Sequence, residues 1–199
     1  LETVRGLYAG EVETVDEQLE RITAYLERTG MAKETLTVIT SDHGEGFGET
    51  DEMGRKRMGH EGSVSDAVLS VPLVIAHPAL EANQINEHVS LKQLHCLLVD
   101  DVAELLDSGG TELGALTPPT DPVWSHYPAV GGEYLFEKYP DAPTKALEQR
   151  VSIDTVVAYS DGWKVVATSD GERWAQQSGT EAEYDNVPAA LQSQCEQQL

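Results

Sequence analysis

Apolar positions divide the first half of the chain into alternating helical and extended segments. Residues 4–29 carry apolar side chains at steps of three and four, which predicts one amphipathic helix that ends at Gly30. Residues 35–40 and 71–76 are short, apolar runs rich in β-branched side chains, a composition typical of buried strands. Residues 90–106 again show helical spacing. Because helices alternate with buried strands, we expect an α/β fold with a mostly parallel sheet flanked by helices.

The second half of the chain has a different pattern. Residues 107–150 contain most of the prolines and show weak periodicity, which predicts a long connection across the surface. Residues 151–158 and 163–168 flank a Ser-Asp-Gly turn and predict an antiparallel β-hairpin, and residues 187–199 predict a terminal helix. We therefore expect three parts: an α/β core part at 1–110, a connecting segment at 111–150, and a small C-terminal α+β subdomain at 151–199.

The charge of the chain limits its possible partners and surroundings. There are 35 Asp and Glu residues against 13 Lys and Arg, a formal net charge of -22, and the acidic residues are spread along the whole chain. Such self-repulsion is screened at molar salt, so we expect folding to need high salt, and the composition favours the high-salt cytoplasm of a halophile as the location. Nucleic acid is excluded as a partner because its binding needs a basic patch.

Hydropathy and cysteine usage add two further expectations. No segment approaches the roughly 20 consecutive apolar residues of a membrane span, so we expect no membrane-spanning helix. Cys96 and Cys195 lie far apart without a metal-binding or disulfide-type spacing, so we expect no disulfide framework, and we expect Cys96 to lie in the core.

The stretch Ser41-Asp42-His43-Gly44-Glu45 follows the first predicted strand directly. An adjacent Asp and His at a strand end, with glycines that let the backbone turn, can present oxygen and nitrogen donors to one divalent cation. The alternative is that Asp42 caps a turn and His43 is simply exposed.

This stretch resembles the metal-binding motif of the sulfatase family in the alkaline phosphatase superfamily. Further matches occur in the family's order along nearly the whole chain: Tyr8, Val15 and Asp16 in the first helix, Gly59-His60-Glu61, residues 71–75 and 89–106, Trp163 to Val166, and Tyr184-Asp185. The resemblance implies an alkaline phosphatase-like fold, present in part, and identifies the chain as the C-terminal part of a sulfatase-type hydrolase.

The resemblance also implies roles for individual residues. Asp42 and His43 would be metal ligands, and His60 would lie near the anionic oxygens or the leaving group of the substrate. Lys56 would contact the sulfate or phosphate group; in the alternative, Arg55-Lys56-Arg57 is a solvated loop patch. Glu45 would orient His43 or be surface charge. The divalent ion would be calcium by likeness to sulfatases, with manganese or zinc as the alternatives.

The family's nucleophile motif, Cys- or Ser-x-Pro-x-Arg, does not occur in this chain. We therefore expect the nucleophile and further carboxylates in an upstream N-terminal half of the same protein, and we expect this chain alone to be inactive. The substrate would be a small-molecule sulfate or phosphate ester. Two alternatives to a sulfatase stay open: a phosphodiesterase or phosphonate hydrolase of the same superfamily, and a non-catalytic binding module that retains the fold.

Overall fold

The computed structural model describes residues 1–51, 54, 56–60, 62–86, 88–100, 102–107, 122–128 and 153–199. Most of the predicted connection at 111–150 lies outside the described residues. The limits of the three predicted parts stay predictions. Among the described helices, none is both long and apolar enough to cross a membrane.

The first helix forms where the apolar spacing predicts it. Helix α1 (Glu2–Thr29) ends at Gly30, which has a φ of 75° and whose N–H donates to the carbonyl of Glu27 at 3.1 Å. A residue with a side chain would be strained at this φ, so glycine suits the position. A short 3-10 helix, η1 (Met31–Glu34), then leads into strand β1 (Thr37–Thr40). The N-terminal part of α1 contacts the next hairpin through the edge-to-face ring pair of Tyr8 and Phe47, whose centroids are 5.0 Å apart.

Strand β1 pairs with β4 (Leu73–Ala76), and the two run antiparallel, with Thr40 opposite Leu73 and Thr37 opposite Ala76. The prediction of a mostly parallel sheet is therefore wrong for the described residues, in which every strand pair is antiparallel. A parallel pair needs a crossover that returns the chain to the starting edge of the sheet. Here the chain enters β4 at the end where it left β1, because the described residues between the two strands form a hairpin and a four-residue helix and no crossover.

That intervening hairpin consists of β2 (Gly46–Thr50) and β3 (Lys56–Gly59), and the short helix is α2 (Asp66–Leu69). In the hairpin register, Gly46 lies opposite Gly59, and Thr50 lies opposite Lys56. The open end of the hairpin therefore brings residues just before β2 and just after β3 together.

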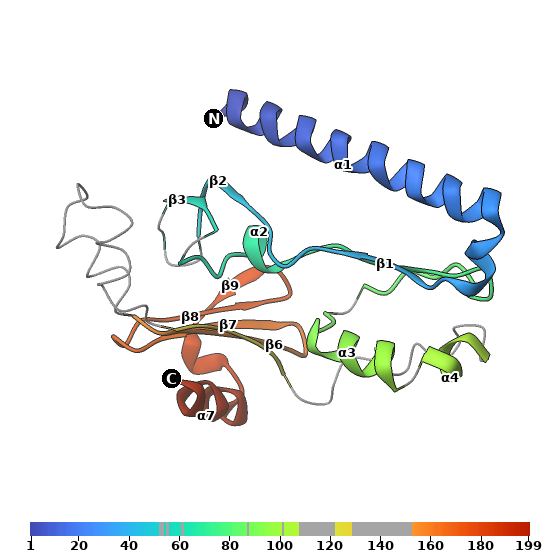
Figure 1. Cartoon of the computed structure of the whole chain (residues 1–199). Coiled ribbons are helices and arrows are strands. Elements are labelled where there is room, and N and C mark those ends of the chain that lie inside the picture. The colour runs from blue at the N-terminus through green and yellow to red at the C-terminus, as the bar shows by residue number, and fades with distance from the viewer. Residues whose placement is uncertain are drawn as a thin grey trace.

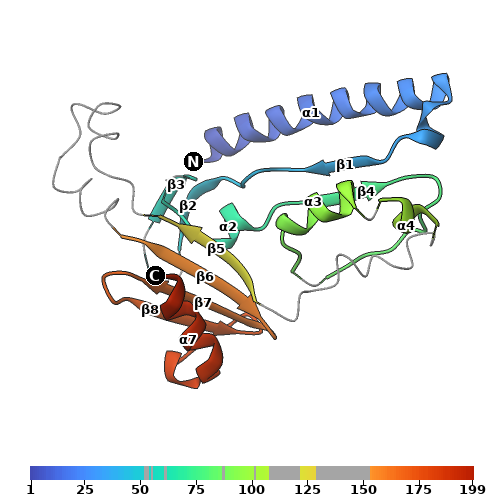
Figure 2. The same ribbon diagram turned by 60° about the horizontal axis from the view of Figure 1, so that its bottom comes forward.

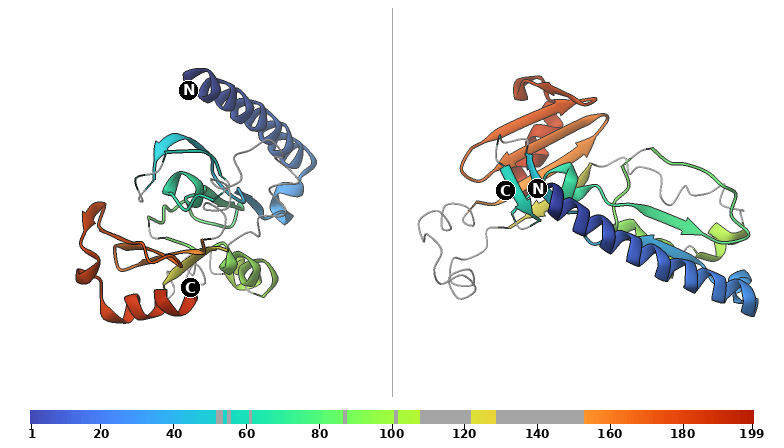
Figure 3. Two further views of the ribbon diagram at one scale, coloured as in Figure 1. Left: turned by 90° about the vertical axis from the view of Figure 1, so that its left-hand side faces the viewer. Right: turned by 90° about the horizontal axis from the view of Figure 1, so that it is seen from above.

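Helices lie on both sides of the β1–β4 pair. Figures 1 and 3 show α1 on one side, and α3 (Lys92–Val99) and α4 (Val102–Asp107) on the other. The predicted helix at 90–106 is thus two helices. Leu97 and Leu105 are its buried residues, whereas Leu98 is 43% exposed. Cys96 is exposed, so its predicted core position is wrong: the buried side of α3 is one residue further along.

The C-terminal region is a five-stranded antiparallel sheet in the order β5-β6-β7-β8-β9. Its strands are β5 (Val123–Tyr127), β6 (Thr155–Ser160), β7 (Trp163–Thr168), β8 (Arg173–Gln177) and β9 (Thr180–Ala182). The predicted hairpin is confirmed: Asp161 and Gly162 both have positive φ, 47° and 78°, as a two-residue type I′ turn requires. Strand β5, between Pro122 and Pro128, falls in the predicted connection and was not expected.

One face of this sheet is covered by the last helix (Figure 2). The 3-10 helix η3 (Tyr184–Asn186) leads to α7 (Ala189–Gln198), which confirms the predicted terminal helix. Leu191 and Cys195 of α7 pack against Ala158, Trp163 and Val165. On the opposite face, Val157 and Val166 pack with Val64, which lies just before α2, and with Leu69, the last residue of α2. Residues 64–69 are called the α2 segment below. The sheet therefore has one core on its own helix and a second against the segment that follows β3.

Candidate functional site

The candidate site begins at the loop after β1. Ser41 Oγ donates a hydrogen bond to the carbonyl of His43 at 2.7 Å, and the His43 N–H donates to Asp42 Oδ1 at 3.0 Å. These bonds define a tight turn that leaves the Asp42 side chain 88% exposed. The neighbouring imidazole of His43 and the hydrogen bond from the His43 N–H hold the pKa of Asp42 below the usual 3.8. Asp42 is therefore an exposed, ionised carboxylate at the end of the strand.

The ring of His43 has a defined orientation. Its Nδ1 lies 2.8 Å from the carbonyl oxygen of Gly44, which can only accept, so Nδ1 carries the hydrogen. The lone pair is then on Nε2, which lies 3.8 Å from Asp42 Oδ2. A hydrogen-bonded Nδ1 and an available Nε2 are typical of metal-binding histidines.

The β2–β3 hairpin brings His60 to the same place. The rings of His43 and His60 are stacked, with centroids 3.8 Å apart. His60 Nδ1 lies 3.1 Å from Glu45 Oε2, so the carboxylate of Glu45 pairs with His60. One ligand atom from each of His43, Glu45 and His60 lies within 4.8 Å of the others. Two imidazoles and a carboxylate are a donor set that suits zinc or manganese better than calcium.

Lys56 lies at the other end of the same hairpin. It is exposed and pairs with Thr50, whereas His60 follows Gly59 at the open end. Four residues of extended strand span about 13 Å, so the backbone of Lys56 is well separated from the histidine pair. Arg55, Glu61 and the side chain of Arg57 lie outside what the structure describes. The role of Lys56 in anion binding stays a prediction.

Helix α2 contacts the loop through backbone atoms, a feature that local sequence did not predict. The Gly44 N–H donates to the carbonyl of Val68 at 2.8 Å. A Cβ atom at Gly44 would lie 2.1 Å from the carbonyl oxygen of Ala67, so the loop and α2 are in backbone contact. In turn, Lys164 Nζ and Tyr159 OH each donate to Asp66 Oδ1 at 2.7 Å. The one signal in the sequence was a lysine inside an otherwise apolar strand.

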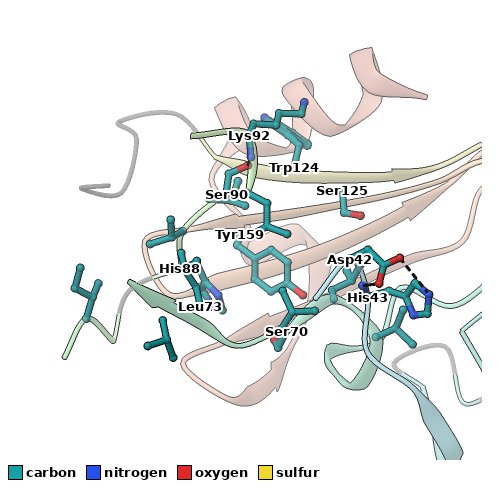
Figure 4. Close-up of a pocket in the computed structure, with 18 of the residues that line it drawn as sticks. Asp42, His43, Ser70, Leu73, His88, Ser90, Lys92, Trp124, Ser125 and Tyr159 are labelled. Carbon is teal, nitrogen blue, oxygen red and sulfur yellow. Dashed lines mark hydrogen bonds and ion pairs between the residues drawn. The ribbon is translucent and has the colours of Figure 1, made fainter. Parts of the chain in front are cut away.

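A cavity of about 670 Å³ opens beside Asp42 and His43. Figure 4 shows the ring of Tyr159 between His88 and the Asp42–His43 pair. The rings of His88 and Tyr159 have centroids 4.5 Å apart. Other lining residues are Ser70, Ser90, Lys92, Trp124 and Ser125. Asp42 and His43 thus lie at the edge of a space lined by both aromatic and polar side chains, whereas Glu45 and His60 are not among its lining residues.

Comparisons with known proteins agree with the motif. Residues 2–108 match the family model described as Sulfatase. The chain is 36% identical over 89 residues to the multifunctional alkaline phosphatase superfamily protein PehA of Trinickia caryophylli, an alignment covering 44% of this chain and 16% of PehA. It is 28% identical over 178 residues to arylsulfatase K of Bos taurus, covering 86% and 30%. It is 31% identical over 121 residues to the low-salt glycan biosynthesis sulfotransferase Agl7 of Haloferax volcanii, covering 54% and 28%.

The chain spans less than a third of the length of each of these relatives. The matched segment includes the Asp42–His43 loop, the β2–β3 hairpin, α2 and both strands of the first sheet. It covers more than half of the chain. By this match and by its Ser-Asp-His-Gly-Glu motif, the chain belongs to the sulfatase family of the alkaline phosphatase superfamily.

Proposed function

We propose that this chain supplies part of the active site of a metal-dependent sulfatase that hydrolyses small-molecule sulfate esters. The observation that carries the proposal is the cluster of His43, Glu45 and His60 after β1, with Asp42 Oδ2 3.8 Å from His43 Nε2, within the segment that matches the family. Members of this family generally use a divalent metal ion, and the ligand geometry supports one here.

Asp42 and His43 fit a shared ion. Two atoms that each bind one ion at about 2.0–2.4 Å are held about 3–4 Å apart. Asp42 Oδ2 and His43 Nε2 are 3.8 Å apart, and the second oxygen of Asp42 is already occupied by a backbone N–H. A bound ion would draw electron density from the ester oxygens and so ease attack at sulfur. We propose that Asp42 and His43 hold this ion and orient it toward the cavity.

His60 is proposed as the group that contacts the ester oxygens. Its Nδ1 faces Glu45 Oε2, which fixes the ring, and we propose that Nε2 contacts the substrate. From there the imidazole can donate a hydrogen bond to an anionic oxygen or a proton to the leaving oxygen. In the alternative ligand set, His60 and Glu45 join His43 on the metal, which would favour zinc or manganese over calcium.

The remaining parts of the site are proposed to come from the rest of the protein. Two ligands are fewer than the four of zinc or the six to eight of calcium. We therefore propose that the nucleophile and further carboxylates lie in sequence beyond these 199 residues.

A phosphoester or phosphonate hydrolase is the second candidate function. It is favoured by the likeness to PehA, whose name describes a multifunctional superfamily member. Sulfate and phosphate esters present similar anionic oxygens, so the same ion and histidine would serve both. Rates with nitrophenyl sulfate, phosphate and phenylphosphonate would separate the two functions, and binding without turnover of any of them would indicate a binding module.

The test uses the protein as the cell expresses it, including any sequence beyond these 199 residues. His43→Ala and Asp42→Asn are expected to lower kcat/KM for nitrophenyl sulfate by at least about 100-fold, because each removes a proposed metal ligand. His126→Ala is the control: His126 also lies near a carboxylate, 3.6 Å from Asp154, and is 47% exposed, but it lies on β5. Unchanged hydrolysis in both site variants would overturn the proposal.

A further inference from the structure

Lys164 is a charged residue in the interior of the C-terminal sheet. It lies on the central strand β7, opposite Tyr159 of β6, and its side chain is only 6% exposed. Both residues are on the face that packs with Val64 and Leu69 rather than on the face that α7 covers. A buried ammonium group is costly unless a carboxylate and hydrogen bonds compensate it. The position of Lys164 therefore requires a carboxylate partner.

The structure supplies that partner from α2. Lys164 Nζ and Tyr159 OH both donate to Asp66 Oδ1, each at 2.7 Å. Burial raises the pKa of Asp66, but the hydrogen bonds from Lys164 and Tyr159 lower it by more. The pKa of Asp66 is therefore below 3.8. Asp66 is the first residue of α2, which has four residues and is too short to be stable alone. Its position is set by what it packs against.

From α2 the contacts continue to the candidate metal loop. The carbonyl of Val68 accepts the N–H of Gly44, and the carbonyl of Gly44 accepts Nδ1–H of His43. Because Gly44 is in backbone contact with Ala67, the loop cannot move toward α2. A shift of α2 would therefore move Gly44 and turn the ring of His43, which is stacked on His60.

We infer that Lys164 is a positioning residue of the metal centre: its ion pair with Asp66 fixes α2, α2 fixes Gly44, and Gly44 fixes the imidazole of His43. The metal role of His43 rests on the proposed function above. The C-terminal sheet then belongs to the scaffold of the active site, although Lys164 touches neither metal nor substrate.

The same sheet offers a matched control. Arg173 of β8 pairs with Glu196 of α7 through two bonds, Nε to Oε1 at 2.7 Å and Nη2 to Oε2 at 2.8 Å. This ion pair also joins a strand to a helix, but it involves α7 rather than the α2 segment. Arg173→Met should therefore affect stability without moving the metal loop.

The experiment compares Lys164→Met, Lys164→Met/Asp66→Asn, Lys164→Arg and Arg173→Met in the naturally expressed protein. The readouts are the Kd for Mn²⁺ by calorimetry, the melting temperature, and the ¹⁵N signals of the His43 side chain without metal. We expect Lys164→Met to weaken Mn²⁺ binding about tenfold and to shift the His43 signals. Lys164→Arg should keep the Kd for Mn²⁺ and the His43 signals near their wild-type values. Arg173→Met should lower only the melting temperature. In the double variant, which leaves no unpaired charge, the melting temperature should recover while Mn²⁺ binding stays weak.

Other results would overturn the inference. One is recovery of Mn²⁺ affinity together with stability in the double variant; another is an equal loss of affinity in Arg173→Met. If the wild-type protein binds none of Mn²⁺, Zn²⁺ and Ca²⁺, the proposed function fails, and the His43 signals alone decide: unchanged signals in Lys164→Met refute the positioning role. If Lys164→Met does not fold, Tyr159→Phe removes one of the two bonds to Asp66 and should cause a smaller change in the same signals; no change refutes it.

Discussion

The two sheets of this chain are packed very differently. In the C-terminal sheet, Val157 and Val165 have no exposed surface, and α7 covers one face. In the first region, β1 and β4 form a pair with no fully buried residue, and the apolar positions of α1 are open, with Val12 52% and Ile22 53% exposed. Yet the first region holds the family motif and the candidate ligands. The chemistry lies in the part with the smaller core, and that part is tied to the larger core through α2.

The difference shows what an apolar pattern can and cannot establish. The stripe along α1 predicts a helix with a face to bury, and the helix forms, but the described residues leave most of that face open. We propose that this face packs against sequence outside these 199 residues, since the relatives are more than three times longer than the aligned region. The C-terminal sheet needs no such addition, because its apolar faces meet α7 and the α2 segment.

The largest expected difference is in the cost of losing apolar side chains. Leu191→Ala, at a position 5% exposed, should lower the free energy of unfolding by about 2–5 kcal/mol. Val12→Ala in α1 should change it by less than about 0.5 kcal/mol in the 199-residue chain. Urea unfolding of both variants measures this. An equal cost in the two would contradict the comparison, whereas a cost for Val12→Ala seen only when further sequence is present would support the proposal that α1 is covered there.

The two cysteines should react at very different rates. Burial raises the pKa of Cys195 to about 11 from 9.0, and the residue has no exposed surface, whereas Cys96 is exposed. The thiolate is the reactive form, so labelling of Cys195 by a disulfide reagent should be at least about 100-fold slower. Cys96→Ser should remove the fast phase in native protein. Two equal phases would mean that the α7 face is not closed.

Gly44 is expected to be intolerant of a side chain. Gly44→Ala should cost about 1–3 kcal/mol, because its Cβ would lie 2.1 Å from the carbonyl oxygen of Ala67. Gly10→Ala is the control: no atom lies within 4 Å of its Cβ, and alanine favours a helix by up to about 1 kcal/mol. Chemical unfolding followed by circular dichroism compares the two. If Gly44→Ala were as stable as Gly10→Ala, the contact between the loop and α2 would be wrong.

Salt should stabilise the whole chain. With a net charge of -22, the free energy of unfolding should rise as KCl increases from 0.1 M to molar concentrations, because screening weakens the repulsion between acidic groups. Circular dichroism across a KCl series follows the gain. Equal stability at low and high salt would contradict the proposal that the protein is adapted to high salt.

The smallest expected effect is the acid dependence of the Asp66 ion pair. Since the folded pKa of Asp66 is below 3.8, its contribution is present above about pH 4 and is lost as the pH falls through the folded value. The stability difference between wild type and Asp66→Asn should therefore shrink below pH 4. The Asp66 side chain is 54% exposed, so solvent screening keeps this contribution small. A difference that grew on acidification would have the wrong sign.

Several parts of this structure followed from local sequence. The end of α1 at Gly30 and the Asp161-Gly162 turn could be predicted because these residue types readily adopt the positive φ that each position requires. The family motif indicated that His60 would return near Asp42 and His43, and it stacks on His43. Each of these depends on a few neighbouring residues or on a recognised pattern.

Other features depend on information that spacing does not carry. Apolar runs do not encode strand direction, so the antiparallel pairing of β1 and β4 was mispredicted. Strand β5 is flanked by prolines, and its sequence Val-Trp-Ser-His-Tyr does not alternate between apolar and polar residues, so no strand was predicted there. On α3, a shift of one residue buried Leu97 in place of Cys96. Asp66 and Lys164 are 98 positions apart in sequence, so their ion pair could only be seen once the sheet had placed them together.

The central claim is that Asp42 and His43 hold a divalent ion beside His60. The most direct test is a crystal structure of the naturally expressed protein grown with Mn²⁺, using anomalous scattering to locate the ion. The account predicts an anomalous peak about 2.0–2.4 Å from both His43 Nε2 and an oxygen of Asp42. A peak bound by neither residue, or none at a Mn²⁺ concentration that supports hydrolysis, would contradict it.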